Sequence, residues 1–214
     1  MNRAILCVEI YFRPFYLLSI VTFNGVFKII KVSKDRIGAL VGKKGLVKSE
    51  IESKCNVHLD IDGESGDVSI GFKNDNSSID IGVFKASEII MAVSKGFSPQ
   101  RAYSLLNEDN VLQFVDLREY SGKSINSLER IKSRIIGQSG KTRRNIEDFT
   151  GVYLSVYGHF VGFIGNYEET NLAVNAVTML CKGSSHKSVY HMLEEYRRKK
   201  KLEKMDLWEK NDGR

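Results

Sequence analysis

Two short stretches, Leu40-Val41-Gly42-Lys43-Lys44-Gly45 and Ile135-Ile136-Gly137-Gln138-Ser139-Gly140, share one pattern. In each, two aliphatic residues run into a Gly-x-x-Gly segment, named here the first loop (residues 42–45) and the second loop (residues 137–140). Both glycines recur 95 positions later, from 42 to 137 and from 45 to 140. The same offset relates Ile51, Glu52, Val57 and Ile61 to Ile146, Glu147, Val152 and Val156. The chain therefore contains an internal duplication.

The residues around each loop predict the same order of elements. Alternating and helical hydrophobic spacing, with Gly, Asn and Pro at the breaks, indicates strand, helix, loop, helix, strand, strand, helix. In the first copy these elements are predicted at 27–32, 35–41, 46–54, 57–61, 67–72 and 79–95, with Ser33 as a cap for the first helix. In the second copy they are predicted at 111–117, 124–136, 142–149, 152–156, 159–164 and 167–181. Ile125, Leu128, Ile131 and Ile135 form the apolar side of helix 124–136. The fold class is therefore α+β.

Five segments follow from this pattern. They are an N-terminal extension (1–25), a first domain (26–95), a connecting helix (96–110), a second domain (111–182) and a basic C-terminal helix and tail (183–214). Ser98 and Pro99 suit the start of the connecting helix. Because this join is short and not low in complexity, we expect the two domains to be docked rather than loosely tethered.

The composition is typical of a folded protein, and its positive net charge favours binding to anions. The 214 residues are 42% hydrophobic and 27% charged, with a formal net charge of +6. The last nineteen residues contain eight Lys or Arg against four Asp or Glu, so most of the excess lies there. A positive balance favours anionic partners. The basic run is equally compatible with a solvated helix end and with an extended RNA contact.

Neither the N-terminal segment nor the cysteines indicate a membrane anchor, a disulfide or a reactive site. Residues 14–23 are apolar but too short to span a bilayer, and Glu9 and Arg13 interrupt any signal peptide. We expect 1–25 to be an extra strand or the result of a start codon assigned too far upstream. Cys7, Cys55 and Cys181 are distant from one another, which indicates free thiols and a cytoplasmic protein. No metal site, cofactor or catalytic constellation is predicted, and His58 and His159 are expected on strands.

A Gly-x-x-Gly loop between two helices suits contact with a nucleic-acid backbone. Glycine lets a phosphodiester approach without obstruction by a Cβ atom, and the following helix begins with unpaired N–H groups that favour anions. Lys43 and Lys44 in the first copy, and Lys141, Arg143 and Arg144 just past the second, add positive charge. The aliphatic residues before and after each loop would line a groove for bases. This combination predicts binding of a single strand.

With two such loops in the same order of elements, the sequence resembles the KH domain family, with the strand order of the eukaryotic type. The resemblance covers about 26–95 and 111–182. It implies two tandem domains, each a three-stranded sheet backed by helices, with each loop gripping about four nucleotides.

A more specific resemblance is carried by Lys95-Gly96-Phe97-Ser98-Pro99, Val115-Asp116-Leu117-Arg118, Thr150-Gly151-Val152-Tyr153 and Lys182-Gly183-Ser184-Ser185-His186. These stretches are similar to the archaeal form of the small-subunit ribosome assembly factor family called partner of Nob. The resemblance implies a non-catalytic protein that binds near the 3′ end of small-subunit rRNA, and we expect the protein to be a monomer. It also implies contact with the endonuclease Nob and with the alpha subunit of the initiation factor that carries initiator tRNA.

The resemblance also implies which residues contact RNA. They are Ile136, Gly137, Gln138, Ser139, Gly140, Lys141, Arg143 and Arg144, with Gly183, His186 and Lys187 as further candidates, and Gly42, Lys43, Lys44 and Gly45 in the first loop. The sequence leaves open whether the first loop binds RNA.

Three alternatives use the same loops differently. A transcription factor of the NusA-like twin-KH kind would have one strand, not two, after the second loop helix. A nucleotide hydrolase would need a glycine at position 135, where this chain has Ile135, and a strand before the second loop. A protein adaptor would keep both loops for structural reasons only.

Overall fold

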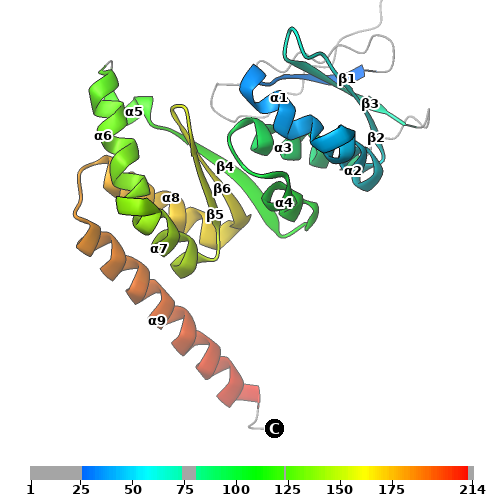
Figure 1. The fold of residues 1–214 in the computed structure, drawn as a ribbon. Coiled ribbons are helices and arrows are strands. Elements are labelled where there is room, and N and C mark those ends of the chain that lie inside the picture. The colour runs from blue at the N-terminus through cyan, green and yellow to red at the C-terminus, as the bar shows by residue number, and fades with distance from the viewer. Residues whose placement is uncertain (1–25, 74–80, 123, 212–214) are drawn as a thin grey trace, which may run out of the picture.

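The computed structural model describes residues 26–73, 81–122 and 124–211, and the interpretation of 1–25 lies outside this part of the chain. Two α+β units follow one another, and a long C-terminal helix extends from the second (Figure 1). The first unit comprises β1 (Val26–Lys31), α1 (Lys34–Val41), η1 (Lys43–Gly45), α2 (Leu46–Cys55), β2 (Val57–Ile61), β3 (Asp67–Phe72) and α3 (Ile81–Ser94). Its antiparallel sheet has the order β1-β3-β2.

The second unit repeats this arrangement. It comprises β4 (Asn110–Asp116), α5 (Arg118–Ser121), α6 (Ile125–Ile136), η3 (Gln138–Gly140), α7 (Lys141–Thr150), β5 (Tyr153–Tyr157), β6 (Phe160–Asn166) and α8 (Tyr167–Cys181). Its sheet has the matching order β4-β6-β5. The predicted fold class, with its duplicated order of strands and helices, is confirmed.

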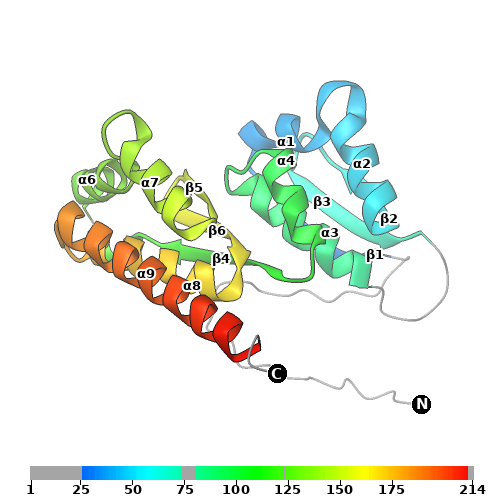
Figure 2. The same cartoon turned by 90° about the horizontal axis from the view of Figure 1, so that it is seen from below.

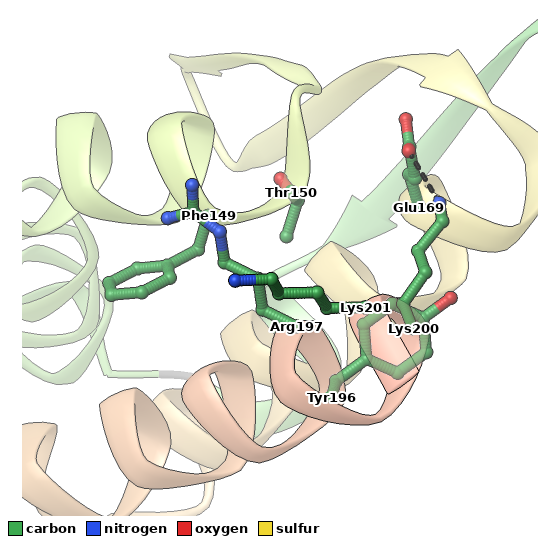
Figure 3. Close-up of a pocket in the computed structure, with 7 residues that line it drawn as sticks. All are labelled: Phe149, Thr150, Glu169, Tyr196, Arg197, Lys200 and Lys201. Atoms are coloured by element: carbon green, nitrogen blue, oxygen red, sulfur yellow. Dashed lines mark hydrogen bonds and ion pairs between the residues drawn. The ribbon is translucent and has the colours of Figure 1, made fainter. Parts of the chain in front are cut away.

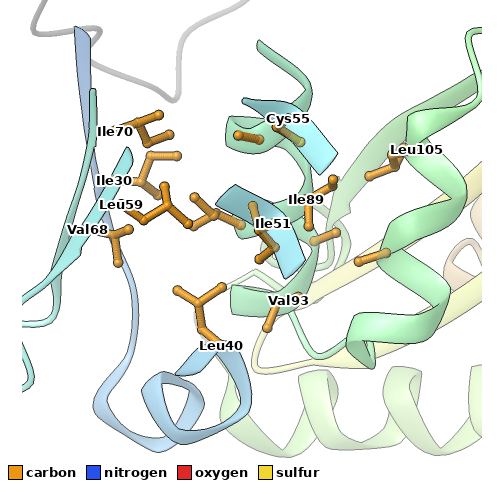
Figure 4. Close-up of a cluster of buried hydrophobic side chains, with 14 of the residues drawn as sticks. Ile30, Leu40, Ile51, Cys55, Leu59, Val68, Ile70, Ile89, Val93 and Leu105 are labelled. Atoms are coloured by element: carbon orange, nitrogen blue, oxygen red, sulfur yellow. The ribbon is translucent and has the colours of Figure 1, made fainter. Parts of the chain in front are cut away.

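Each unit has its own core between the sheet and the helices. In the first, Leu40, Ile51, Leu59, Ile70 and Ile89 are fully buried (Figure 4). In the second, the corresponding residues include Ile135, Ile146, Leu154, Phe163 and Ala176. Alternation along the strands and the helical spacing of aliphatic residues place these side chains on one side of each element.

The duplication continues past the two closing helices. After α3 the chain reads Lys95-Gly96-Phe97-Ser98, and after α8 it reads Lys182-Gly183-Ser184-Ser185. Gly96 and Gly183 have φ angles of 96° and 97°. Ser98 then accepts a hydrogen bond from the Arg101 N–H, and Ser185 accepts one from the Ser188 N–H. Each unit is thus followed by a serine-capped helix: α4 (Pro99–Ala102), which continues into η2 (Tyr103–Leu106), and α9 (His186–Asn211).

The join packs against the second sheet, as expected for docked domains. Phe97 is 1% exposed, and a Cβ atom added to Gly162 would lie 2.7 Å from its Cε2 atom. Ser155 donates a hydrogen bond to the Lys95 carbonyl oxygen over 3.1 Å. Arg36 of α1 donates to the Phe97 carbonyl oxygen over 2.6 Å. The two units therefore share a polar and apolar junction.

Several local expectations differ from the structure. Ser33 precedes α1 without a side-chain capping bond, and its Oγ lies 3.1 Å from the Tyr157 hydroxyl of the second unit instead. Ile125 is 77% exposed because it occupies the first position of α6, before that helix meets the core. His159 lies in the turn before β6 rather than on a strand, and the short helix α5 was not predicted.

Candidate nucleic-acid interface

The two loops have the same backbone conformation. Gly137, Ser139 and Gly140 have φ angles of 71°, 52° and 75°, and Gly42, Lys44 and Gly45 have 72°, 55° and 78°. In the second loop, the Gly140 N–H donates to the Gly137 carbonyl oxygen over 3.2 Å, and the first loop has the equivalent bond over 3.3 Å. The pattern that recurs in the sequence is therefore one tight turn made twice.

The two glycines of each loop serve different purposes. A Cβ atom at Gly137 would collide with the side chain of Thr142, and one at Gly42 would collide with Val47. A Cβ atom at Gly140 or Gly45 would meet nothing within 4 Å. The first glycine is thus required for packing against the next helix, whereas the second borders open space where a ligand backbone can approach.

The polar side chains of the second loop are available to a ligand. Gln138, Ser139 and Lys141 are exposed, and so is Arg144 one turn into α7. Arg144 donates a hydrogen bond to the Ser139 carbonyl oxygen over 2.6 Å. The amino end of α7 begins directly at the loop, so its unpaired N–H groups and these two cations favour an anion there.

Arg143, also predicted to contact RNA, has a different orientation. It is half-buried, and its Nε atom lies 3.9 Å from Oε2 of Glu147. Glu147 in turn accepts hydrogen bonds from the Leu154 N–H and from Arg101, each over 2.9 Å. Arg143 therefore belongs to the set of contacts that joins α7 to β5 and to the connecting helix.

Glu147 has a duplicate, Glu52, whose role the sequence did not reveal. Glu52 accepts a hydrogen bond from the Leu59 N–H over 2.9 Å, as Glu147 does from Leu154. Both pairs are seven residues apart, and both attach the helix after the loop to the neighbouring strand. The recurrence of glutamate at the 95-residue offset was the signal that could have indicated this.

Only part of the predicted apolar groove is exposed. Ile136 is 37% exposed beside the second loop, and Leu46 is 61% exposed beside the first. Ile135 and Leu40, which begin the two motifs, are fully buried in the cores, and Val41, the counterpart of Ile136, is half-buried. The aliphatic residue presented to the surface therefore precedes the second loop but follows the first, and the first residue of each motif anchors its helix in the core.

The segment with Gly183, His186 and Lys187 lies next to the end of α6. Arg134 donates a hydrogen bond to the Ser184 carbonyl oxygen, and Nε2 of His186 lies 3.0 Å from the Arg134 carbonyl oxygen. Arg134 is two residues before Ile136, so the structure brings this segment to the second loop. Gly183 and Lys187 are exposed, whereas His186 is half-buried and held by its contact with α6.

Two pockets were not predicted. One of about 500 Å³ is lined by Lys43 of the first loop, by residues of α2 such as Leu46 and by residues of the connecting helix such as Tyr103. The other, of about 260 Å³, lies between the carboxyl end of α7, the start of α8 and α9 (Figure 3). Each pocket is formed by elements that are far apart in the sequence, so the pattern within a single element does not indicate it.

The alternatives can be weighed against this geometry. The second loop is preceded by a helix, α6, and not by the strand that a nucleotide-hydrolase loop requires. Two strands, β5 and β6, follow α7, unlike the NusA-like arrangement. Within the described residues there is no group of three or more His, Cys, Asp or Glu placed to hold a metal ion. No helix among them is long and apolar enough to cross a bilayer.

Comparisons with known proteins agree with the duplicated fold. The family model for the second KH domain of PNO1, a eukaryotic-type (type I) KH domain, matches residues 111–198, and a general KH domain model matches residues 27–92. A KH domain-containing protein of Methanocaldococcus jannaschii is 42% identical over 86% of this chain and 79% of its own length. The pre-rRNA-processing protein PNO1 of Debaryomyces hansenii is 26% identical over 57% of this chain and 49% of its own.

A solved structure is similar along most of the chain. The match is a chain in the crystal structure of the complex of a/eIF2alpha, aDim2p and rRNA from Pyrococcus horikoshii. That chain is 40% identical with a TM-score of 0.75, and the match covers 80% of this chain and 94% of that chain. Sequence, fold and loop geometry agree, and the chain belongs to the KH-domain family of PNO1 and Dim2p, in its archaeal form.

Proposed function

We propose that this protein binds single-stranded RNA near the 3′ end of small-subunit rRNA and acts in pre-rRNA processing without catalysing a reaction itself. The second loop is its main contact. The observation that carries the proposal is the open side of Gly140, next to exposed Lys141 and Arg144 at the start of α7. A sugar-phosphate backbone fits such a surface, and bases can lie over Ile136.

The relatives support this assignment. The Debaryomyces relative is named a pre-rRNA-processing protein, and the Pyrococcus relative was solved with rRNA. We assign the RNA contacts to Ile136, the residues of the second loop, Lys141, Arg144, Gly183 and Lys187. Arg143 and His186 position their neighbours. The first loop, with Gly42, Lys43, Lys44 and Gly45, is a further RNA contact, supported by its matching backbone angles.

We further propose two protein partners and two RNA-binding units. The alpha subunit of the initiation factor is a partner, supported by the Pyrococcus complex, which contains a/eIF2alpha together with aDim2p and rRNA. The endonuclease Nob is a further partner, supported by the sequence resemblance. The protein acts as a cytoplasmic monomer, with RNA-binding units at 26–95 and 111–182 joined by 96–110.

The test compares three double variants for binding to a 12-nucleotide RNA copied from the 3′ end of small-subunit rRNA. Q138D/S139D puts two negative charges in the second loop and should weaken binding on the order of 100-fold, equivalent to about 2.8 kcal/mol. N107D/N175D adds the same charge at two exposed sites elsewhere and should change affinity less than twofold. K43D/K44D measures how much the first loop contributes to the RNA affinity. Full affinity in Q138D/S139D would exclude the second loop and favour a protein adaptor.

A further inference from the structure

The pocket between α7, α8 and α9 combines aromatic rings with positive charge. Phe149 and Thr150 line it from the end of α7, Glu169 from α8, and Tyr196, Arg197, Lys200 and Lys201 from α9. Figure 3 shows the long side chains of Arg197 and Lys201 rising from α9 toward the end of α7. The pocket holds about 260 Å³, which is enough for part of a nucleotide but not for a folded partner.

The charges of α9 are not neutralised evenly. Arg198 lies 4.0 Å from Glu195, Lys199 lies 3.9 Å from Glu203, and Lys200 donates to Glu169 over 2.8 Å. In the described part of the chain, Arg197 and Lys201 have no carboxylate partner. These two are the cations that line the pocket together with Lys200.

Arg197 and Lys201 are one helical turn apart, so their charges lie on the same side of α9. Like charges at this spacing destabilise a helix. An anion between them would remove that repulsion. A phosphate is suited to both, because guanidinium and ammonium groups donate several hydrogen bonds each.

The position of the pocket favours RNA over an acidic protein segment. Helix α9 starts beside the end of α6, which leads into the second loop, and packs along α7 and α8 (Figure 2). The ten residues of α7 separate the loop from the pocket by about 15 Å. A strand held at the loop can therefore reach the pocket within a few nucleotides. Phe149 and Tyr196 offer rings for a base, beside cations for its phosphate.

We propose that this pocket binds one nucleotide of the RNA strand that continues from the second loop, with its phosphate between Arg197 and Lys201 and its base against Phe149. This inference rests on the proposed function. It makes the carboxyl end of α7 a second point of attachment and explains why the basic run belongs to the binding surface.

The experiment uses the full chain and two RNA lengths, the 12-nucleotide strand and a four-nucleotide piece of it that fills one loop. R197Q/K201Q should weaken binding of the 12-nucleotide strand about tenfold and lower the slope of log K against log salt concentration by about 0.7, as expected for the loss of one phosphate contact on a single strand. The four-nucleotide piece should bind unchanged. R198Q/K199Q removes the same charge from the same helix outside the pocket and should alter either affinity less than twofold.

A second variant tests the base. F149L keeps apolar bulk but removes the ring, and it should weaken only the 12-nucleotide strand, by about fivefold. Thermal melts followed by circular dichroism check that all variants fold. Equal losses in R197Q/K201Q and R198Q/K199Q would overturn the pocket in favour of diffuse charge. An unchanged 12-nucleotide affinity would also overturn it and leave the pocket to an acidic protein segment. If the wild-type protein binds neither RNA, the proposed function itself fails.

Discussion

Arg144 braces the second loop through its hydrogen bond to the Ser139 carbonyl oxygen, at 2.6 Å. Ser139 has a φ angle of 52°, a left-handed conformation that is unusual for a residue with a side chain. The bond holds this residue in place while leaving its side chain exposed. In the first copy the corresponding position is Ser49, which is too short to reach Lys44 in this way.

Because the first loop lacks a counterpart of the Arg144–Ser139 hydrogen bond, the two loops should differ in backbone mobility and in their contribution to RNA binding. Replacing Arg144 by Ser, as in the first copy, should weaken RNA binding on the order of tenfold, equivalent to about 1.4 kcal/mol. It removes a cation and also loosens the carbonyl of Ser139. Nitrogen relaxation of the Ser139 and Gly140 amides should then resemble that of Lys44 and Gly45. Unchanged affinity with unchanged relaxation would mean that Arg144 neither braces the loop nor contacts RNA.

The two glycines of the second loop should differ in their effect on stability. Gly137 has φ 71° and ψ 175°, a region open essentially to glycine alone, and a Cβ there would collide with Thr142. Gly137→Ala should therefore lower the free energy of unfolding by about 3 kcal/mol or more. Gly140→Ala, which meets open space, should lose only about 1 kcal/mol for its left-handed backbone. Urea denaturation measures both, and equal losses would contradict the assignment.

Glu147 should contribute more to stability than its duplicate Glu52. Both accept a strand N–H, but only Glu147 also accepts from Arg101, which belongs to the connecting helix. Glu147→Ala should lower the free energy of unfolding by about 2–3 kcal/mol, and Glu52→Ala by about 1–2 kcal/mol. The partly exposed Arg101 adds less than a buried partner would. Thermal unfolding of the two variants, with Arg101→Ala as a third, tests this ranking.

His159 should make stability depend on pH. Burial lowers its pKa from the usual value near 6.5, and Arg118, Lys95 and Lys132 lower it further, against the opposing effect of Asp116. The unfolded chain therefore binds a proton at a higher pH than the folded protein does. Stability should be full above about pH 6.5 and fall as the pH drops below that value. His159→Gln should flatten the decline. A titration of the His159 ring by NMR that gives a pKa above 6.5 would contradict this sign.

The sequence predicted the fold well because its signals are local. Asn56 ends α2 in a left-handed conformation, and Tyr167–Cys181 forms α8 with the predicted bounds. Helix periodicity and turn residues determine such elements without reference to the rest of the chain. Ile125 shows where local patterns fail to predict burial. It fits the apolar spacing of α6, but its side chain is 77% exposed at the start of that helix.

The site was predictable in its backbone but not in the orientation of its side chains. The glycine pattern identified both loops, because only glycine tolerates the angles at Gly42 and Gly137. Whether Arg143 faces solvent or Glu147 depends on β5 and on the connecting helix, which are distant in sequence. His186 likewise depends on the carbonyl of Arg134. The pocket beneath Phe149 requires three helices to meet, so no single stretch of sequence indicates it.

We propose that a single RNA strand lies along the second loop. The direct test is an NMR titration of the full chain with the 12-nucleotide strand, following the glycine amides. We predict that the amides of Gly137 and Gly140 shift most and saturate together with the binding curve. Tight binding with both amides unmoved, and shifts confined to other surfaces, would contradict it.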